Sequence, residues 1–136
     1  MHEDLLLLTL NEKWKVNIPF GWIPITGDEK IEDTEIYQSY YFGKYITELK
    51  EIIQNLFNVS MLYEVVDGGS VERKIIADCE IRYDGLEYLY TDENCRFVIY
   101  CSHESSTTIG GKELIDAIHI MWPEYIEHIW TTPFYD

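Results

Sequence analysis

Two glycine-containing turns in the middle of the chain most constrain its fold. The runs "SMLYEVV" and "VERKII" flank Asp67–Ser70, and the runs "CEIRY" and "LEYLY" flank Asp84-Gly85. Short β-branched and aromatic runs around such turns are typical of β-hairpins. Because a type I′ turn at Asp84-Gly85 fixes the register, we expect Arg82 to face Glu87 across the second hairpin. The following run "RFVIYC" then completes an antiparallel meander of about four strands.

Helical patterns flank this predicted sheet. From Glu35 to Phe57 apolar residues recur at steps of three and four, which predicts a helix that Gly43 interrupts and Asn58 ends. A second helical pattern covers Glu113–Trp130, where Pro123 starts a new short helix because proline fits only its first turn. The predicted fold is therefore α+β, with an N-terminal helix and a C-terminal helix pair packed on an antiparallel sheet.

The length of 136 residues is that of one ordinary domain. We expect a single domain over residues 1–136, in which 34–136 form the helix–sheet–helix core. Residues 1–33 are predicted to be an extended arm or edge segment, because they contain Pro19 and Pro24. Within this arm, the apolar run Leu5–Leu10 fits a strand and a helix equally well.

The chain is strongly acidic. It has 25 Asp and Glu against 10 Lys and Arg, a net charge of −15. Such a charge repels nucleic acids and acidic membranes and favours a basic protein partner. No run approaches the roughly 20 apolar residues of a membrane helix, and "MHEDLLLLTL" lacks the basic start of a signal peptide. The three cysteines have no CxxC spacing, which predicts reduced thiols in a cytoplasmic protein.

The stretch "YCSHESSTTIGGKEL" carries the densest set of reactive residue types. Cys101 and His103 would share one face of a strand, so Cys101, His103 and Glu104 are candidates for a catalytic or ligand-binding group. The acidic surroundings would raise the pKa of a thiol rather than lower it, which favours a polar strand-to-helix connection instead. Gly110-Gly111 lies outside any phosphate-loop motif, and no zinc-site spacing occurs. We therefore predict no metal and no cofactor.

The end of the chain combines acidic and aromatic residues. No Lys or Arg follows Lys112. Acidic side chains steer a basic partner and aromatic rings anchor it. The candidate partner-binding residues are Asp116, Glu124, Tyr125, Glu127 and Trp130, and a rival surface is formed by Glu80, Asp84 and Glu87. The alternative is that Trp122 and Trp130 belong to the core and that the acidic residues are simply solvated.

The segments "SHESSTTIGG" and "WPEYIEHIW" resemble small uncharacterised bacterial proteins over about the last third of the chain, a resemblance that implies no activity. As a small acidic α+β protein rich in Tyr and Trp, the chain is also similar in kind to the immunity proteins that neutralise bacterial toxins. We therefore expect a protein-binding module that blocks a basic partner. The alternatives are a small enzyme or ligand-binding domain at Cys101, His103 and Glu104, and a structural protein that self-associates through Trp22, Tyr40, Tyr41 or the C-terminal tail.

Overall fold

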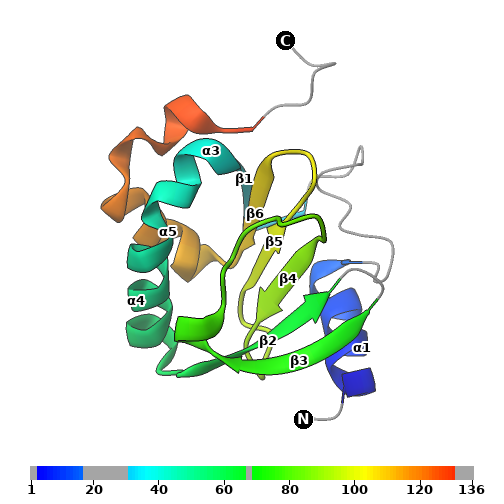
Figure 1. Cartoon of the computed structure of the whole chain (residues 1–136). Coiled ribbons are helices and arrows are strands. Elements are labelled where there is room, and N and C mark those ends of the chain that lie inside the picture. Colours follow the sequence, from blue (N-terminus) through cyan, green and yellow to red (C-terminus); the bar gives the residue numbers. More distant parts are fainter. Residues whose placement is uncertain (1–2, 17–30, 67–68, 131–136) are drawn as a thin grey trace.

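The computed structural model describes residues 3–16, 31–66 and 69–130, and within these ranges an open sheet lies between helices (Figure 1). The sheet has six strands, all antiparallel, in the order β1-β6-β5-β4-β2-β3. The strands are β1 (Thr34–Gln38), β2 (Met61–Val66), β3 (Ser70–Ile75), β4 (Tyr88–Thr91), β5 (Val98–Cys101) and β6 (Ser106–Gly110). The predicted antiparallel α+β class is confirmed, but the sheet exceeds the predicted four-stranded meander by β1 and β6.

Helices cover both faces of the sheet. Helix α1 (Glu3–Trp14) lies on one side, and α4 and α5 lie on the other (Figure 1). The chain also has the short helix α3 and three 3-10 helices, η1, η2 and η3, of which η2 follows β3. The bounds of the helical elements other than α1 are α3 (Ser39–Phe42), η1 (Gly43–Tyr45), α4 (Ile46–Phe57), η2 (Ile76–Asp78), α5 (Lys112–Met121) and η3 (Pro123–His128).

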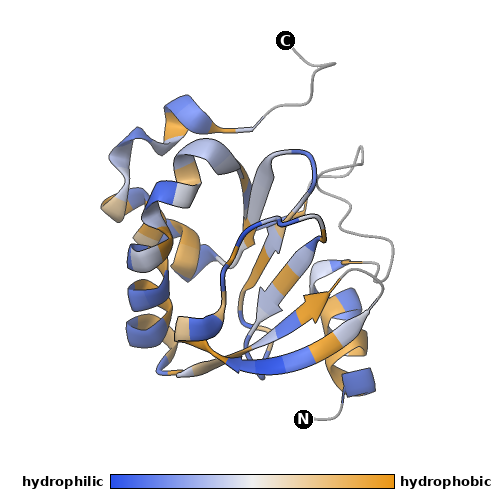
Figure 2. Ribbon diagram, viewed as in Figure 1, coloured by the Kyte–Doolittle hydropathy of each residue, from blue (hydrophilic) through white to orange (hydrophobic). Residues whose placement is uncertain are grey.

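The apolar residues form a separate core on each face of the sheet. In β5, Ile99 and Cys101 belong to the larger core beneath α4 and α5, whereas Val98 and Tyr100 belong to the core beneath α1. A strand that is buried on both faces has no reason to alternate with polar residues, which explains the continuous apolar run in β5. In Figure 2, α4 shows hydrophilic residues along its outward side and hydrophobic residues toward the sheet.

The first predicted helix starts later than the sequence pattern indicated. Residues Thr34–Gln38 form the edge strand β1, in which Tyr37 lies opposite Thr107 of β6. From Ser39 onward the segment is helical and is interrupted at Gly43, as predicted. Asn58 ends α4 in the left-handed conformation, with φ 53° and ψ 48°, which confirms it as the stop.

The predicted hairpin at Asp84-Gly85 is wrong. Strand β4 pairs with β2, with Val65 opposite Leu89, and residues 79–87 contain no strand. After β3, at the edge of the sheet, the chain passes over the face that α4 and α5 cover. There it buries Cys79 and Ile81 in the larger core. Both sides of β4 are occupied, by β2 and β5, so the residues before the turn cannot pair with it. Burial of the two apolar side chains stabilises the crossover instead.

Local polar contacts replace the predicted hairpin register. The carboxylate of Asp84 accepts the backbone N–H of Leu86 at 3.3 Å and the hydroxyl of Tyr88 at 3.0 Å, so that Asp84-Gly85 forms a side-chain-stabilised bend. Arg82 pairs with Glu80 at 3.2 Å instead of with Glu87. A turn that is closed by its own side chain does not require strands on either side.

The stretch after β5 is a hairpin, so the predicted strand-to-helix connection is wrong for most of its length. Ser106–Gly110 form β6, whose five residues are all buried, and Thr107 pairs with Cys101. The β-branched pair Thr107-Thr108 is a strand signal that its polar neighbours obscured. The connection to α5 is reduced to Gly111, which has φ 124°.

The extended arm predicted for residues 1–33 is wrong for its first part, because Glu3–Trp14 form α1. The indole N–H of Trp14 donates to the carbonyl of Cys95 at 2.8 Å and thereby holds the end of α1 on the sheet. Residues 17–30, which include Pro19, Trp22 and Pro24, and the tail 131–136 lie outside the described residues.

We expect Gly110→Ala to destabilise the fold by about 1–3 kcal/mol, because it overpacks the core beneath α1. A Cβ atom at Gly110 would lie 2.7 Å from Cγ2 of Val98 and 3.0 Å from Cζ3 of Trp14. The matched control is Gly43→Ala, where a Cβ atom meets nothing within 4 Å. Urea denaturation should show the loss only for Gly110→Ala; equal midpoints would contradict the close packing of β6 against α1.

Candidate functional site

The turn between β5 and β6 binds its own polar groups. The hydroxyls of Ser102 and Ser106 lie 2.7 Å apart, and the backbone N–H of Glu104 donates to the Ser102 hydroxyl at 3.0 Å. The backbone N–H of Ser102 donates to the carbonyl of Ser106 at 3.1 Å. The serines of this stretch therefore close a tight turn, a role that needs no ligand.

Glu87 joins this turn to the start of β4. Its carboxylate accepts the hydroxyl of Tyr100 at 2.6 Å and the backbone N–H of His103 at 2.9 Å, and it lies 2.6 Å from Nδ1 of His103. Burial opposes ionisation of Glu87, but the hydrogen bonds from Tyr100 and His103 outweigh it and lower the pKa of the carboxyl group. Sequence reasoning identified His103 but paired it with Cys101 instead of Glu87.

The lowered pKa of Glu87 predicts that it stabilises the fold at neutral pH and not in acid. A carboxyl group whose pKa is depressed on folding contributes stability above its unfolded pKa of about 4.3, and loses it as the pH falls through the folded value. We expect Glu87→Gln to be destabilising at neutral pH and to approach the wild type in acid, once the pH lies below the folded pKa of Glu87. Urea midpoints measured across this range test the prediction, and a difference that is independent of pH would contradict it.

Cys101 lies where a nucleophile cannot work. Its side chain is 1% exposed within the larger core, and burial raises the pKa of its thiol to about 12. Cys79 and Cys95 are likewise buried and free. A buried thiol that stays protonated at neutral pH does not support the interpretation of Cys101 as a nucleophile.

A buried polar network that the sequence did not indicate crosses the larger core. Glu64 of β2 is 4% exposed, accepts the hydroxyl of Tyr90 at 2.8 Å and pairs with Lys74 at 3.2 Å. Burial and the bond to Glu64 raise the pKa of Tyr90 well above its ordinary value. Glu64 thus has a hydrogen-bond donor in Tyr90 and a cation in Lys74. The network links β2, β3 and β4 and needs no ligand to satisfy its polar groups.

The predicted partner-binding residues separate into surface carboxylates and packed rings. Glu124 and Glu127 are exposed on η3, and Asp116 of α5 is exposed but pairs with Lys112 at 2.8 Å. Tyr125 stacks on His119 with ring centroids 3.6 Å apart, and the indole N–H of Trp130 donates to the carbonyl of Glu104 at 3.0 Å. Both rings are half-buried, so they fix η3 and the segment after it.

The residues of the rival surface have internal partners. Glu80 pairs with Arg82, Asp84 closes its own bend, and Glu87 holds the β5–β6 turn. Of the rings considered for self-association, Tyr40 is exposed, whereas Tyr41 is half-buried and stacks on His128. The carboxylates of the rival surface are therefore less available to a partner than those near α5.

An open groove of about 410 Å³ lies between α4 and α5. Ile120 at its edge is 82% exposed, although isoleucine is a residue that proteins normally bury. We call this feature the α4/α5 groove, and its lining residues are Glu48, Glu51, Ile52, Asn55, Ala117, Ile120 and Met121. Sequence reasoning missed Ile120, which lies off the buried face that Leu114, Ile115 and Ile118 form on α5.

In the part of the chain that the structure describes, the glutamates at the α4/α5 groove make no ion pair. Among residues 3–16, 31–66 and 69–130, no ion pair or hydrogen bond involves the side chains of the nearby acidic residues other than Asp116. Glu48 and Glu51 line the groove. Glu113 precedes Ala117 by one helical turn and Ile120 by two, so all three share the outward face of α5. The groove thus combines an apolar floor with an acidic rim.

Stacked rings hold the C-terminal elements in place. His128 of η3 lies against Tyr41 with ring centroids 3.8 Å apart and is parallel within 4° to the buried Trp122. His119 of α5 lies 2.9 Å from the carboxylate of Glu35, on β1. These contacts give η3 and its two glutamates a defined position relative to α5.

No family model matches the sequence, and no curated protein or solved structure matches the chain. Within the described ranges, no cluster of His, Cys, Asp and Glu has the geometry of a metal site. No helix in these same ranges is long and apolar enough to cross a membrane.

Proposed function

We propose that the chain is an acidic protein-binding module whose α4/α5 groove takes a basic, amphipathic helix of a partner protein. The observation that carries this proposal is the 82% exposure of Ile120 beside a groove whose rim is acidic. An amphipathic helix presents apolar side chains on one face and charged side chains at its margins. It therefore matches an apolar floor between acidic rims, which is a recurring mode of peptide recognition.

The charge of the module supports a basic partner. The net charge of −15 attracts a cationic protein over a distance of several ångströms and increases its rate of association. Glu48 and Glu51 line the α4 side of the groove, and Glu113 lies by its helical spacing on the same face of α5 as the lining residues there. Glu124 and Glu127, predicted from the sequence as partner-binding residues, add two exposed carboxylates on η3.

The apolar residues support a protein partner rather than a small ion. Ile120 is 82% and Ile126 is 70% exposed, on consecutive helical elements. Exposed apolar side chains with a charged rim are typical of protein–protein interfaces. The similarity in kind to immunity proteins makes a basic bacterial toxin the partner class that we propose, in a cytoplasmic setting.

The test is titration with a synthetic helical peptide of leucine and lysine, with a leucine and glutamate peptide of the same apolar pattern as the control. We expect the basic peptide alone to bind, with an affinity that falls as salt screens the charges. Glu48→Lys combined with Glu51→Lys should slow association and flatten the salt dependence, because charges at the rim of an interface act mainly on encounter.

The matched control is Glu12→Lys combined with Glu93→Lys, which changes the net charge equally at exposed positions outside the groove. Stopped-flow fluorescence should show a smaller effect for this control than for the groove variant. Equal effects of the two double variants would mean that only the overall charge matters, and equal binding of both peptides would overturn the proposal.

A further inference from the structure

Gly43 has neither of the usual structural reasons for a glycine. Its φ of −58° and ψ of −20° are helical, and a Cβ atom placed on it meets nothing within 4 Å. Alanine at a helical position is more favourable than glycine by about 1 kcal/mol. What the missing side chain does provide is open space, because Gly43 lines a cavity. A residue that contradicts its local structural preference often serves a site.

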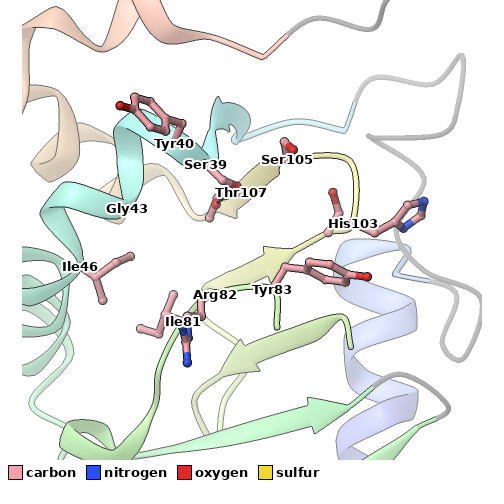
Figure 3. A pocket seen from close by; sticks show the side chains of 11 residues that line it. Ser39, Tyr40, Gly43, Ile46, Ile81, Arg82, Tyr83, His103, Ser105 and Thr107 are labelled. Atoms are coloured by element: carbon pink, nitrogen blue, oxygen red, sulfur yellow. Dashed lines mark hydrogen bonds between the residues drawn. The ribbon is translucent and has the colours of Figure 1, made fainter. Parts of the chain in front are cut away.

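This cavity lies where three segments that are distant in the sequence meet. They are the helical segment from α3 to the first residue of α4, the crossover at residues 81–83, and the β5–β6 turn with the start of β6 (Figure 3). Its volume of about 420 Å³ is within the range of small-molecule sites. It is separate from the α4/α5 groove, since the two share no lining residue.

The walls of the cavity combine two isoleucines with several hydroxyl groups. Ile46 and Ile81 point into it from one side, and Ser39 and Thr107 meet above them (Figure 3). The hydroxyls of Ser39 and Thr107 lie 2.8 Å apart. Because each hydroxyl has one donor and two acceptor sites, the bonded pair keeps one donor and several acceptors for a ligand.

The charged groups in the lining of the cavity have acidic partners outside it. None of its 11 lining residues is acidic, although 25 of the 136 residues of the chain are. The charged ends of Arg82 and His103 point away from Ser39 and Thr107 in Figure 3. Glu80 pairs with the first at 3.2 Å and Glu87 with the second at 2.6 Å. A cation finds no carboxylate in the lining, and an anion meets the negative field of the whole chain.

We propose that this cavity binds a neutral, hydroxylated ring compound with the chemistry of a monosaccharide. The C–H face of such a ring packs on Ile46 and Ile81, and its hydroxyls exchange hydrogen bonds with Ser39 and Thr107. Burial of a neutral polar ligand is favourable only where its hydroxyls find partners, which the hydroxylated wall supplies.

The experiment is an NMR titration of the full chain with a panel of neutral monosaccharides in the millimolar range, compared with their phosphorylated forms and with arginine methyl ester. We expect at least one neutral sugar to shift the backbone resonances of Ser39, Gly43 and Thr107. Gly43→Leu should occupy the cavity and weaken that binding at least about tenfold, while Gly43→Ala should keep it within about twofold.

Ile120→Ser, in the separate groove, should leave sugar binding unchanged and so distinguishes this site from the proposed protein interface. The NMR spectra also show whether each variant remains folded. The proposal is overturned if no neutral sugar shifts these resonances, if a charged probe binds there more tightly, or if folded Gly43→Leu binds as well as the wild type.

Discussion

Replacing Trp122 by alanine is expected to lower the free energy of unfolding by about 3–5 kcal/mol. Trp122 is 2% exposed, and its ring lies 5.2–6.0 Å from those of Tyr37, Phe42, Tyr45 and His128. Trp122 follows α5, and its side chain thereby connects β1, α3, η1 and η3. Its removal leaves a cavity that the surrounding rigid rings cannot fill, and such a cavity adds to the lost burial.

Urea denaturation checks this value, with Trp130→Ala as the comparison. Trp130 is half-buried and its indole N–H donates to the carbonyl of Glu104, so removal of its side chain should cost clearly less. A loss below about 1 kcal/mol for Trp122→Ala would contradict its position at the centre of the ring cluster. Trp122 therefore belongs to the core, whereas Trp130 is only half-buried.

Ile120→Ser is expected to weaken binding of the leucine and lysine peptide about 10- to 100-fold without changing stability. Burial of an isoleucine side chain in a complex contributes about 1.5–3 kcal/mol, which corresponds to this range of affinity. In the unbound chain Ile120 is 82% exposed, so little burial is lost on folding. Most of the effect should appear as faster dissociation, because the side chain acts after encounter.

The control for this variant is Ile75→Ser, the same chemical change at a residue of β3 that is 54% exposed and lies outside the groove. Fluorescence anisotropy with the labelled peptide should distinguish the two variants. Similar affinities for Ile120→Ser, Ile75→Ser and the wild type would show that the apolar edge of the groove makes no contact with the peptide.

Where local preference and tertiary packing agree, the sequence predicts the fold. The helical period of Ile46–Phe57, the stop at Asn58 and the helix start at Pro123 are all confirmed, because each depends on neighbouring residues. The segment Thr34–Gln38 fits both a helical and a β period, and only its pairing with β6 decides between them. Strand partners that are distant in the chain are not visible in a local pattern.

The failed hairpin has a similar cause. Asp84-Gly85 is a strong local turn signal, but it competes with burial of Ile81, which adopts φ 51° within the core cluster. The energy of that burial comes from residues of distant segments, and the sequence around the turn does not indicate it. The same holds for the cavity beside Gly43, whose walls come from three separate segments.

The exposure of some candidate residues can be predicted from the sequence. The exposed carboxylates of Glu124 and Glu127 follow from the helical spacing of the C-terminal region. The exposure of Ile120 could have been inferred from the same spacing, since it lies on the face of Glu113. The position of Glu48 and Glu51 beside that face could not be inferred from the sequence, because only the packing of α4 against α5 brings them there.

The most direct test of the proposed function is to map where the basic peptide binds on the wild-type chain by NMR chemical-shift perturbation. We predict that the largest shifts occur at the two sides of the groove, in Glu48–Asn55 and in Ala117–Met121, and that they shrink together as salt is added. Perturbations centred instead on β3, on α1 or on the β5–β6 turn would contradict the account, as would shifts of equal size with the acidic peptide.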